Sequence, residues 1–137
     1  MRHLLLAPVF CATLAACAAP GAPRPAASVT LAPGQSAEVA PGVTITFEAA
    51  EDSRCPPGMR CVRAGTLAYR FSIRQGEAAP DTFTLAPGQP AASPAHLGGR
   101  RIVLDETAIP APAAPGAAIA WRATIRIVPP STLPTTP

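Results

Sequence analysis

Lysine is missing from this chain of 137 residues, so apart from two histidines every basic side chain is an arginine. Charged residues make up only 14% of the sequence, the formal net charge is +3, and aromatic residues contribute 4%. A nucleic-acid surface needs clustered basic residues interleaved with stacking aromatics. These shortages argue against a nucleic-acid partner.

Groups that could carry catalysis are equally scarce. After residue 17 the only histidine is His96, in a long stretch rich in alanine and proline, where a solvated side chain is a simpler interpretation than a catalytic base. The acidic pairs Glu51-Asp52 and Asp105-Glu106 stand at the expected ends of strands, where carboxylates are solvated. Glycine-rich phosphate loops and zinc-protease motifs are missing. We therefore expect no enzyme, no catalytic residues, no cofactor and no metal site.

The N-terminal segment contains an apolar run that is too short to span a bilayer, for which a helix needs ~20 residues. Arg2 and His3 precede this run, which covers residues 4–14, and Leu14-Ala15-Ala16-Cys17 follows. This segment resembles the signal peptide and lipobox of bacterial lipoproteins. The resemblance implies a signal peptide of residues 1–16, cleavage before Cys17, and acylation of Cys17 by chains such as palmitate, each buried CH₂ contributing about 0.8 kcal/mol to anchoring.

The alternative is an ordinary secretory signal cut after Ala16-Cys17-Ala18. The cysteines fit the lipoprotein interpretation, because Cys11 leaves with the signal peptide, Cys17 takes the lipid, and Cys55 and Cys61 remain as a pair. Ala18 differs from the aspartate that often retains lipoproteins in the inner membrane of enteric bacteria. The resemblance therefore implies a lipid anchor in the outer membrane, facing the periplasm.

Composition divides the rest of the chain into a tether, a domain and a tail. Residues 17–27 combine the anchor with a proline- and alanine-rich tether that would extend ~30 Å at ~3.1 Å per residue. Residues 28–128 alternate apolar and polar side chains, as half-buried strands do. Residues 129–137 form a proline-rich tail that we expect to be disordered.

The alternation predicts a single all-β domain with about seven strands separated by Pro-Gly turns, an antiparallel β-sandwich or small barrel. An immunoglobulin-like arrangement is the first guess. The aromatics after residue 17 all fall on the inward face. The inward positions are Val29, Leu31, Ala37, Val39, Val43, Ile45, Phe47, Leu67, Tyr69, Phe71, Ile73, Phe83, Leu85, Ile102, Leu104, Ile119, Trp121, Ala123, Ile125 and Ile127.

Residues 51–65 hold the one local feature with chemistry. Pro57-Gly58 suits the two central positions of a type II turn, so the chain doubles back and brings Cys55 and Cys61 within reach of a disulfide bond. A metal site using these thiols with Met59 and His96 is the competing interpretation. An oxidising compartment and an incomplete set of ligands argue against it.

The run Asp52-Ser53-Arg54-Cys55-Pro56, followed after four residues by Cys61-Val62-Arg63-Ala64-Gly65, is similar to a D-S-R-C-P…C-x-W-A-G pattern. That pattern recurs in small exported bacterial proteins and lipoproteins of unknown function. Arg63 stands where the pattern has tryptophan. The resemblance implies a β-rich exported domain and does not specify an activity.

Three functions remain open on the sequence. The first is a non-enzymatic envelope lipoprotein whose β domain binds or supports an envelope protein or glycan, with Pro56, Pro57, Gly58, Met59 and Arg60 as a candidate recognition loop. The second is a protease inhibitor that presents the loop between the two cysteines, and the third is periplasmic metal binding. Outward arginines could add a basic stripe if their strands pair; they are Arg70, Arg74, Arg122 and Arg126.

Overall fold

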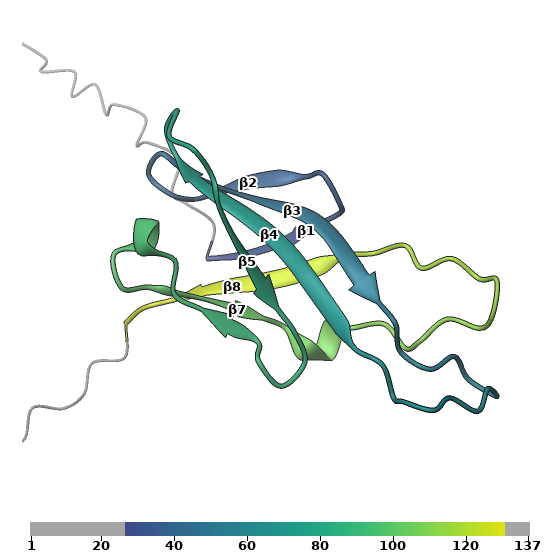
Figure 1. The fold of residues 1–137 in the computed structure, drawn as a ribbon. Helices are drawn as coiled ribbons and strands as arrows, with labels where there is room; N and C mark the ends of the chain where they lie inside the picture. Colours follow the sequence, from purple (N-terminus) through teal and green to yellow (C-terminus); the bar gives the residue numbers. More distant parts are fainter. Residues whose placement is uncertain (1–26, 131–137) are drawn as a thin grey trace, which may run out of the picture.

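Two four-stranded antiparallel sheets pack against each other in the computed structural model, which describes residues 27–130 (Figure 1). The predicted all-β sandwich is confirmed. One sheet has the order β1 (Ser28–Leu31), β8 (Ala123–Val128), β7 (Arg101–Leu104), β6 (Ala91–Ala92). The other has the order β2 (Ser36–Ala40), β3 (Val43–Asp52), β4 (Leu67–Gln75), β5 (Asp81–Leu85). Two short 3-10 helices, η1 (Ala95–Leu97) and η2 (Glu106–Ala108), flank β7.

The strand order is a meander. Each hydrogen-bonded pair joins strands that follow one another in sequence, except that β1 pairs with β8 and so brings the two ends of the domain together. An immunoglobulin domain uses Greek-key connections instead, so the immunoglobulin-like guess is replaced by a meander. The structure has one strand more than the seven predicted. The additional strand is β6, whose Ala91 and Ala92 pair with Val103 and Ile102 but are too few to show alternation in the sequence.

The predicted alternation places the core correctly. Along β4, Tyr69, Phe71 and Ile73 are fully buried, while Arg70 and Arg74 are exposed. The aromatic rings pack on one another: the Phe47 ring centroid lies 5.3 Å from Phe71 and 5.7 Å from Tyr69. Such contacts between rings stabilise a core beyond the area that they bury, and they connect β3 to β4 in the centre of the sandwich.

The last strand is shorter than the alternation predicts. It begins at Ala123, so the expectation that Ile119 and Trp121 belong to it is wrong. The reason lies in its neighbours: β1 ends where Leu31 pairs with Ala123, and β7 ends where Leu104 pairs with Ile125. Beyond Ala123 no strand remains to accept the ladder hydrogen bonds, and the backbone leaves the sheet.

The four outward arginines, which could have formed a basic stripe, do not share a face. Arg70 and Arg74 lie on β4, whereas Arg126 lies on β8 of the other sheet and Arg122 directly precedes that strand. Because β4 and β8 do not pair and their exposed residues face away from a common core, the stripe does not form. Arg70 is instead paired with Glu51 of the neighbouring strand β3.

The two ends of the sandwich differ. Ser28 pairs with Arg126, so the chain enters and leaves the described part at one end, which lies to the left in Figure 1. Two long connections project from the opposite end: residues 53–66 between β3 and β4, called the disulfide loop, and residues 110–118, called the proline loop. Within residues 27–130 no helix is long and apolar enough to cross a membrane.

Candidate functional site

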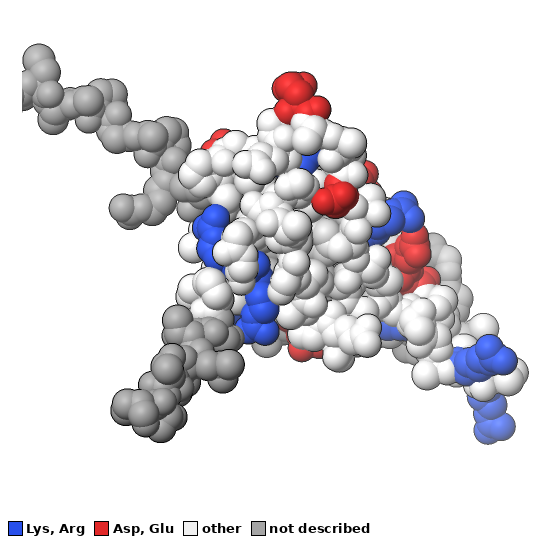
Figure 2. Space-filling view, turned by 60° about the vertical axis from the view of Figure 1, so that its left-hand side comes forward, with Lys and Arg blue, Asp and Glu red and all other residues white. Residues whose placement is uncertain are grey.

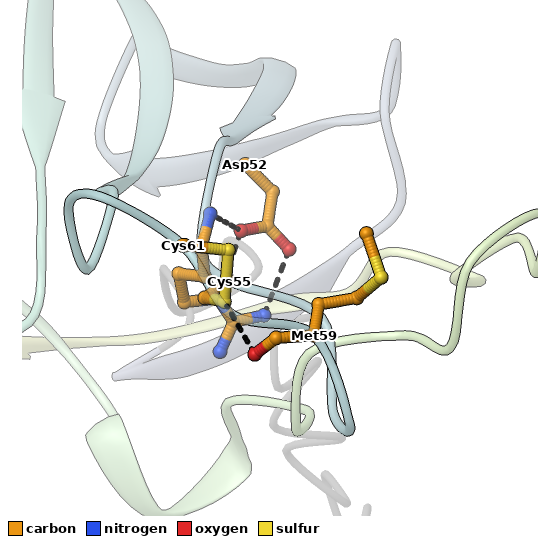
Figure 3. The surroundings of a disulfide bond; sticks show 5 residues. Asp52, Cys55, Met59 and Cys61 are labelled. Carbon is orange, nitrogen blue, oxygen red and sulfur yellow. Dashed lines mark hydrogen bonds and ion pairs between the residues drawn. A yellow bond between two sulfur atoms is a disulfide. The ribbon is translucent and has the colours of Figure 1, made fainter.

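Cys55 and Cys61 form a disulfide bond, as predicted, with their Cα atoms 5.9 Å apart (Figure 3). The predicted turn is also present. Gly58 has φ of 78° and the Met59 amide donates to the Pro56 carbonyl at 3.2 Å, the hydrogen bond of a type II turn with glycine at its third position. The turn and the disulfide together fix a ring at the tip of the disulfide loop.

The base of the disulfide loop continues the β3–β4 hairpin without regular strand pairing. The Ser53 amide donates to the Thr66 carbonyl at 2.8 Å, the Thr66 amide donates to the Ser53 hydroxyl at 3.0 Å, and the Cys55 amide donates to the Ala64 carbonyl at 3.1 Å. Gly65 has φ of 73°, and a Cβ atom there would lie 1.9 Å from the Ser53 carbonyl oxygen. Only glycine allows this approach of the two backbones.

Asp52 and Arg54 form a two-pronged ion pair at the end of β3. Arg54 Nε donates to Asp52 Oδ1 at 2.8 Å and a terminal guanidinium nitrogen donates to Oδ2 at 2.9 Å, with both side chains largely covered. The Arg54 backbone amide donates to Oδ1 as well, at 3.0 Å. The side-chain hydrogen bonds from Arg54 lower the pKa of Asp52, and those to Asp52 raise the pKa of Arg54.

Arg54 also joins the two projecting loops. Its other terminal nitrogen donates to the Pro110 carbonyl at 2.9 Å, a contact between residues that are 56 positions apart. Tyr69 is fully buried, and its ring meets the Trp121 ring edge-on at a centroid distance of 5.9 Å. Burial raises the pKa of Tyr69, and its hydroxyl finds no hydrogen-bond partner among residues 27–130.

A cavity of about 290 Å³ opens between the two loops. We call it the loop cavity. Its polar wall is the Asp52–Arg54 pair, and Trp121, which is half-buried, lines it from the segment that leads into β8. The rest of the lining is apolar or small and includes Pro112, Pro115 and Ile119. The volume stands at the lower end of the range for small-molecule sites.

The tip of the disulfide loop carries the exposed large apolar side chains of residues 27–130. Met59 is 54% exposed and Val62 is fully exposed. Arg60 and Arg63 are exposed beside them, and the tip between Pro56 and Ala64 contains no acidic residue. Figure 2 shows the same projection, with basic side chains and no acidic ones at its end.

The other residues that the sequence singled out lie elsewhere. Cys17 is outside the described residues. His96 belongs to η1, where its Nε2 lies 2.9 Å from Asp81 Oδ2, an ion-pair distance without the alignment of a hydrogen bond. Asp81 pairs with Ile73 on β4, about 20 Å from the Leu67 end of that strand at ~3.3 Å per residue. The metal ligand set of Met59, His96 and the two cysteines is therefore not assembled. Within residues 27–130, no three His, Cys, Asp or Glu side chains cluster.

The sequence did not reveal the roles of Arg54, Trp121 and the Pro110 carbonyl. One signal was available for the ion pair: side chains two positions apart on an extended backbone share a face, so Asp52 and Arg54 could have been expected to meet. Nothing in the spacing of Arg54 and Pro110 could have indicated their contact.

Fold and site together define a small antiparallel β-sandwich with a disulfide-closed loop and an adjoining cavity at the end opposite its termini. No protein family, curated protein or solved structure matches the chain. The resemblance to lipoproteins and to the D-S-R-C-P pattern stays a prediction from the sequence.

Proposed function

We propose that the protein is a non-enzymatic lipoprotein of the bacterial envelope that uses the tip of its disulfide loop to bind another envelope component. In this proposal Cys17 anchors the chain in the outer membrane and residues 17–27 serve as a tether on the periplasmic side. The termini and the disulfide loop lie at opposite ends of the domain. A domain tethered at Ser28 would therefore present the loop away from the membrane.

The observation that carries the binding role is the exposure of Met59 and Val62 on a tip that is held rigid. Large apolar side chains exposed together on a soluble surface mark interaction sites. The disulfide bond and the type II turn fix the backbone before any partner arrives, which lowers the entropy lost on binding. Arg60 and Arg63 add positive charge without a neighbouring carboxylate. The partner surface that fits is apolar with an acidic rim.

Photo-crosslinking in the native envelope tests the binding role. A photoreactive residue at Val62 should give crosslinked species that mass spectrometry can identify. The matched control is a photoreactive residue at Glu77, which is also exposed but lies beyond Gln75, at the opposite end of β4. Combined Met59→Ala and Arg60→Ala substitutions should remove the Val62 crosslinks without changing the melting temperature. Retention of the full set of crosslinks by that double variant would refute the recognition role of the tip.

Fractionation tests the anchor separately. Cys17→Ser should release the protein from the membrane fraction of the expressing bacterium, because no acyl chain can then be attached. A Cys17→Ser protein that still sediments with membranes would contradict the lipoprotein assignment.

The second candidate is a protease inhibitor, supported by the exposure of Arg60 in a disulfide-closed ring. A trypsin-like protease accepts arginine in its specificity pocket, and a rigid loop that presents arginine could stay bound there and block the protease. The purified protein should then inhibit trypsin stoichiometrically, and Arg60→Ala should abolish the inhibition. Rapid cleavage after Arg60, or no effect on trypsin, would exclude this function.

A further inference from the structure

We infer that the loop cavity binds one ring of a neutral sugar. This goes beyond the proposed role of the loop tip, because the cavity shares only Pro56 with the recognition loop and does not use its exposed Met59 or Arg60. Two properties of its wall carry the inference: the balanced charge of the Asp52–Arg54 pair and the tryptophan that lines the same space.

The charge of the wall selects against ions. Asp52 and Arg54 neutralise each other, so an anionic ligand would meet the carboxylate and a cationic ligand would meet the guanidinium. Either ligand would have to be desolvated beside a group of its own sign without a free countercharge. A neutral ligand avoids this penalty.

The same pair requires a polar ligand. A guanidinium has five N–H donors, and Arg54 uses three of them on Asp52 and Pro110. The remaining N–H groups and the unused lone pairs of the Asp52 carboxylate offer donors and an acceptor at fixed positions. A purely apolar ligand would strip water from these groups without replacing its hydrogen bonds.

The apolar part of the lining requires an apolar surface on that ligand. Trp121 and Pro112 belong to this part, and the neighbouring Ala114 and Gly116 are small enough to let a ring approach closely. A pyranose ring combines an apolar face of C–H groups with hydroxyl pairs on its edge. It therefore suits both the ion pair and the apolar lining, and a volume of about 290 Å³ suits a single ring better than a folded peptide.

Trp121 makes the inference directly measurable, because it is the only tryptophan of the chain. The detergent-purified full chain should be titrated separately with glucose, galactose, mannose and N-acetylglucosamine while tryptophan fluorescence is recorded. At least one of these sugars should give a saturable change. A proline-rich peptide, glutamate and lysine serve as competing ligands of other chemistry.

Two variants locate the site. Arg54→Lys keeps the charge but loses the planar pair of hydrogen bonds, and it should weaken the binding of the sugar at least tenfold. Ala114→Phe fills the cavity from an exposed loop position and should abolish binding without lowering the melting temperature. Arg70→Lys is the matched control, because Arg70 also pairs with a strand β3 carboxylate but lies outside the cavity.

Each outcome decides the inference. Saturable binding of a neutral sugar that both site variants weaken and Arg70→Lys preserves would support it. No saturable response to any of the four sugars would overturn it, and so would a response only to the peptide or to a charged ligand. Sugar binding that survives Ala114→Phe would place the site elsewhere and overturn it too. None of these results depends on lipidation or on crosslinks at Val62, so the proposed function can fail independently.

Discussion

The Ser53 carbonyl oxygen occupies the space that a side chain at position 65 would need: a Cβ atom on Gly65 would lie 1.9 Å from it. This approach lets the chain continue the β3–β4 hairpin into the disulfide loop. It also gives a physical reason for the glycine that ends the run Cys61-Val62-Arg63-Ala64-Gly65.

Gly65→Ala should therefore lower the free energy of unfolding by at least about 3 kcal/mol, because positive φ costs ~1–2 kcal/mol and the backbone must also move. The control is Gly58→Ala, since Gly58 has a similar φ of 78° but no atom within 4 Å of its added Cβ. That change should cost only the ~1–2 kcal/mol of the strained dihedral. Chemical denaturation of both variants measures the difference. Equal losses would mean that the contact with Ser53 is not needed.

Removal of the disulfide bond by Cys55→Ser with Cys61→Ser should lower the free energy of unfolding by about 2 kcal/mol, as expected for a loop of roughly seven residues. The intact mass should first show that the unreduced protein is two hydrogens lighter than the reduced one. Free thiols in the unreduced sample would refute the bond. An unchanged unfolding curve of the double variant would instead mean that the hydrogen bonds of the disulfide loop hold it in place without the disulfide bond.

Trp121 and Arg122 are neighbours with unequal burial. Trp121 is half-buried against the core, so Trp121→Ala should cost about 2 to 3 kcal/mol, below the ~3 to 5 of a fully buried aromatic. Arg122 is exposed, and Arg122→Ala should stay within about ±0.5 kcal/mol. Thermal denaturation of the two variants, followed by circular dichroism, measures the difference. Equal effects would contradict the inward position of Trp121.

The Asp52–Arg54 pair predicts a dependence of stability on pH. Because the folded state lowers the pKa of Asp52 below 3.8, the unfolded state binds more protons in that range. The stabilisation is present above the unfolded pKa of 3.8 and is lost as the pH falls through the lower folded value. Asp52→Asn should therefore be less stable than the wild type at neutral pH, and the gap should narrow below pH 3.8.

Comparison of the two proteins at each pH removes the contribution of Asp105, whose pKa is also lowered in the folded state and which both proteins contain. Urea unfolding at a series of pH values gives the difference in free energy. A gap that stays constant across the series would mean that the ion pair does not stabilise the fold.

Much of the fold follows from local patterns. The alternation of Tyr69, Phe71 and Ile73 with outward residues predicted β4 and its buried face, because side chains on a strand point to opposite sides in turn. Pro57-Gly58 predicted a turn for an equally local reason, since one residue presets φ and the other accepts a positive value. The short reach between Cys55 and Cys61 made their bond predictable as well.

The candidate site could be predicted from the sequence only in part. The motif containing Asp52 and Arg54 could be recognised, but the ion pair that these residues form was not predicted. The loop cavity depends on the arrival of the proline loop, whose Pro110 carbonyl accepts from Arg54 across 56 positions. No periodicity in the sequence encodes such a contact, because it is made by loops whose positions the packed sheets determine.

The sequence by itself determined which residues of the seven predicted strands face inward, where the chain turns at Pro57-Gly58 and which cysteines bond, since each of these depends on neighbours within a few positions. Only the tertiary structure decided the strand order, the start of β8 at Ala123 and the separation of Arg70 from Arg126. These features depend on which strands become neighbours. A strand extends only as far as an adjacent strand supplies hydrogen bonds, and a face exists only once its strands are paired.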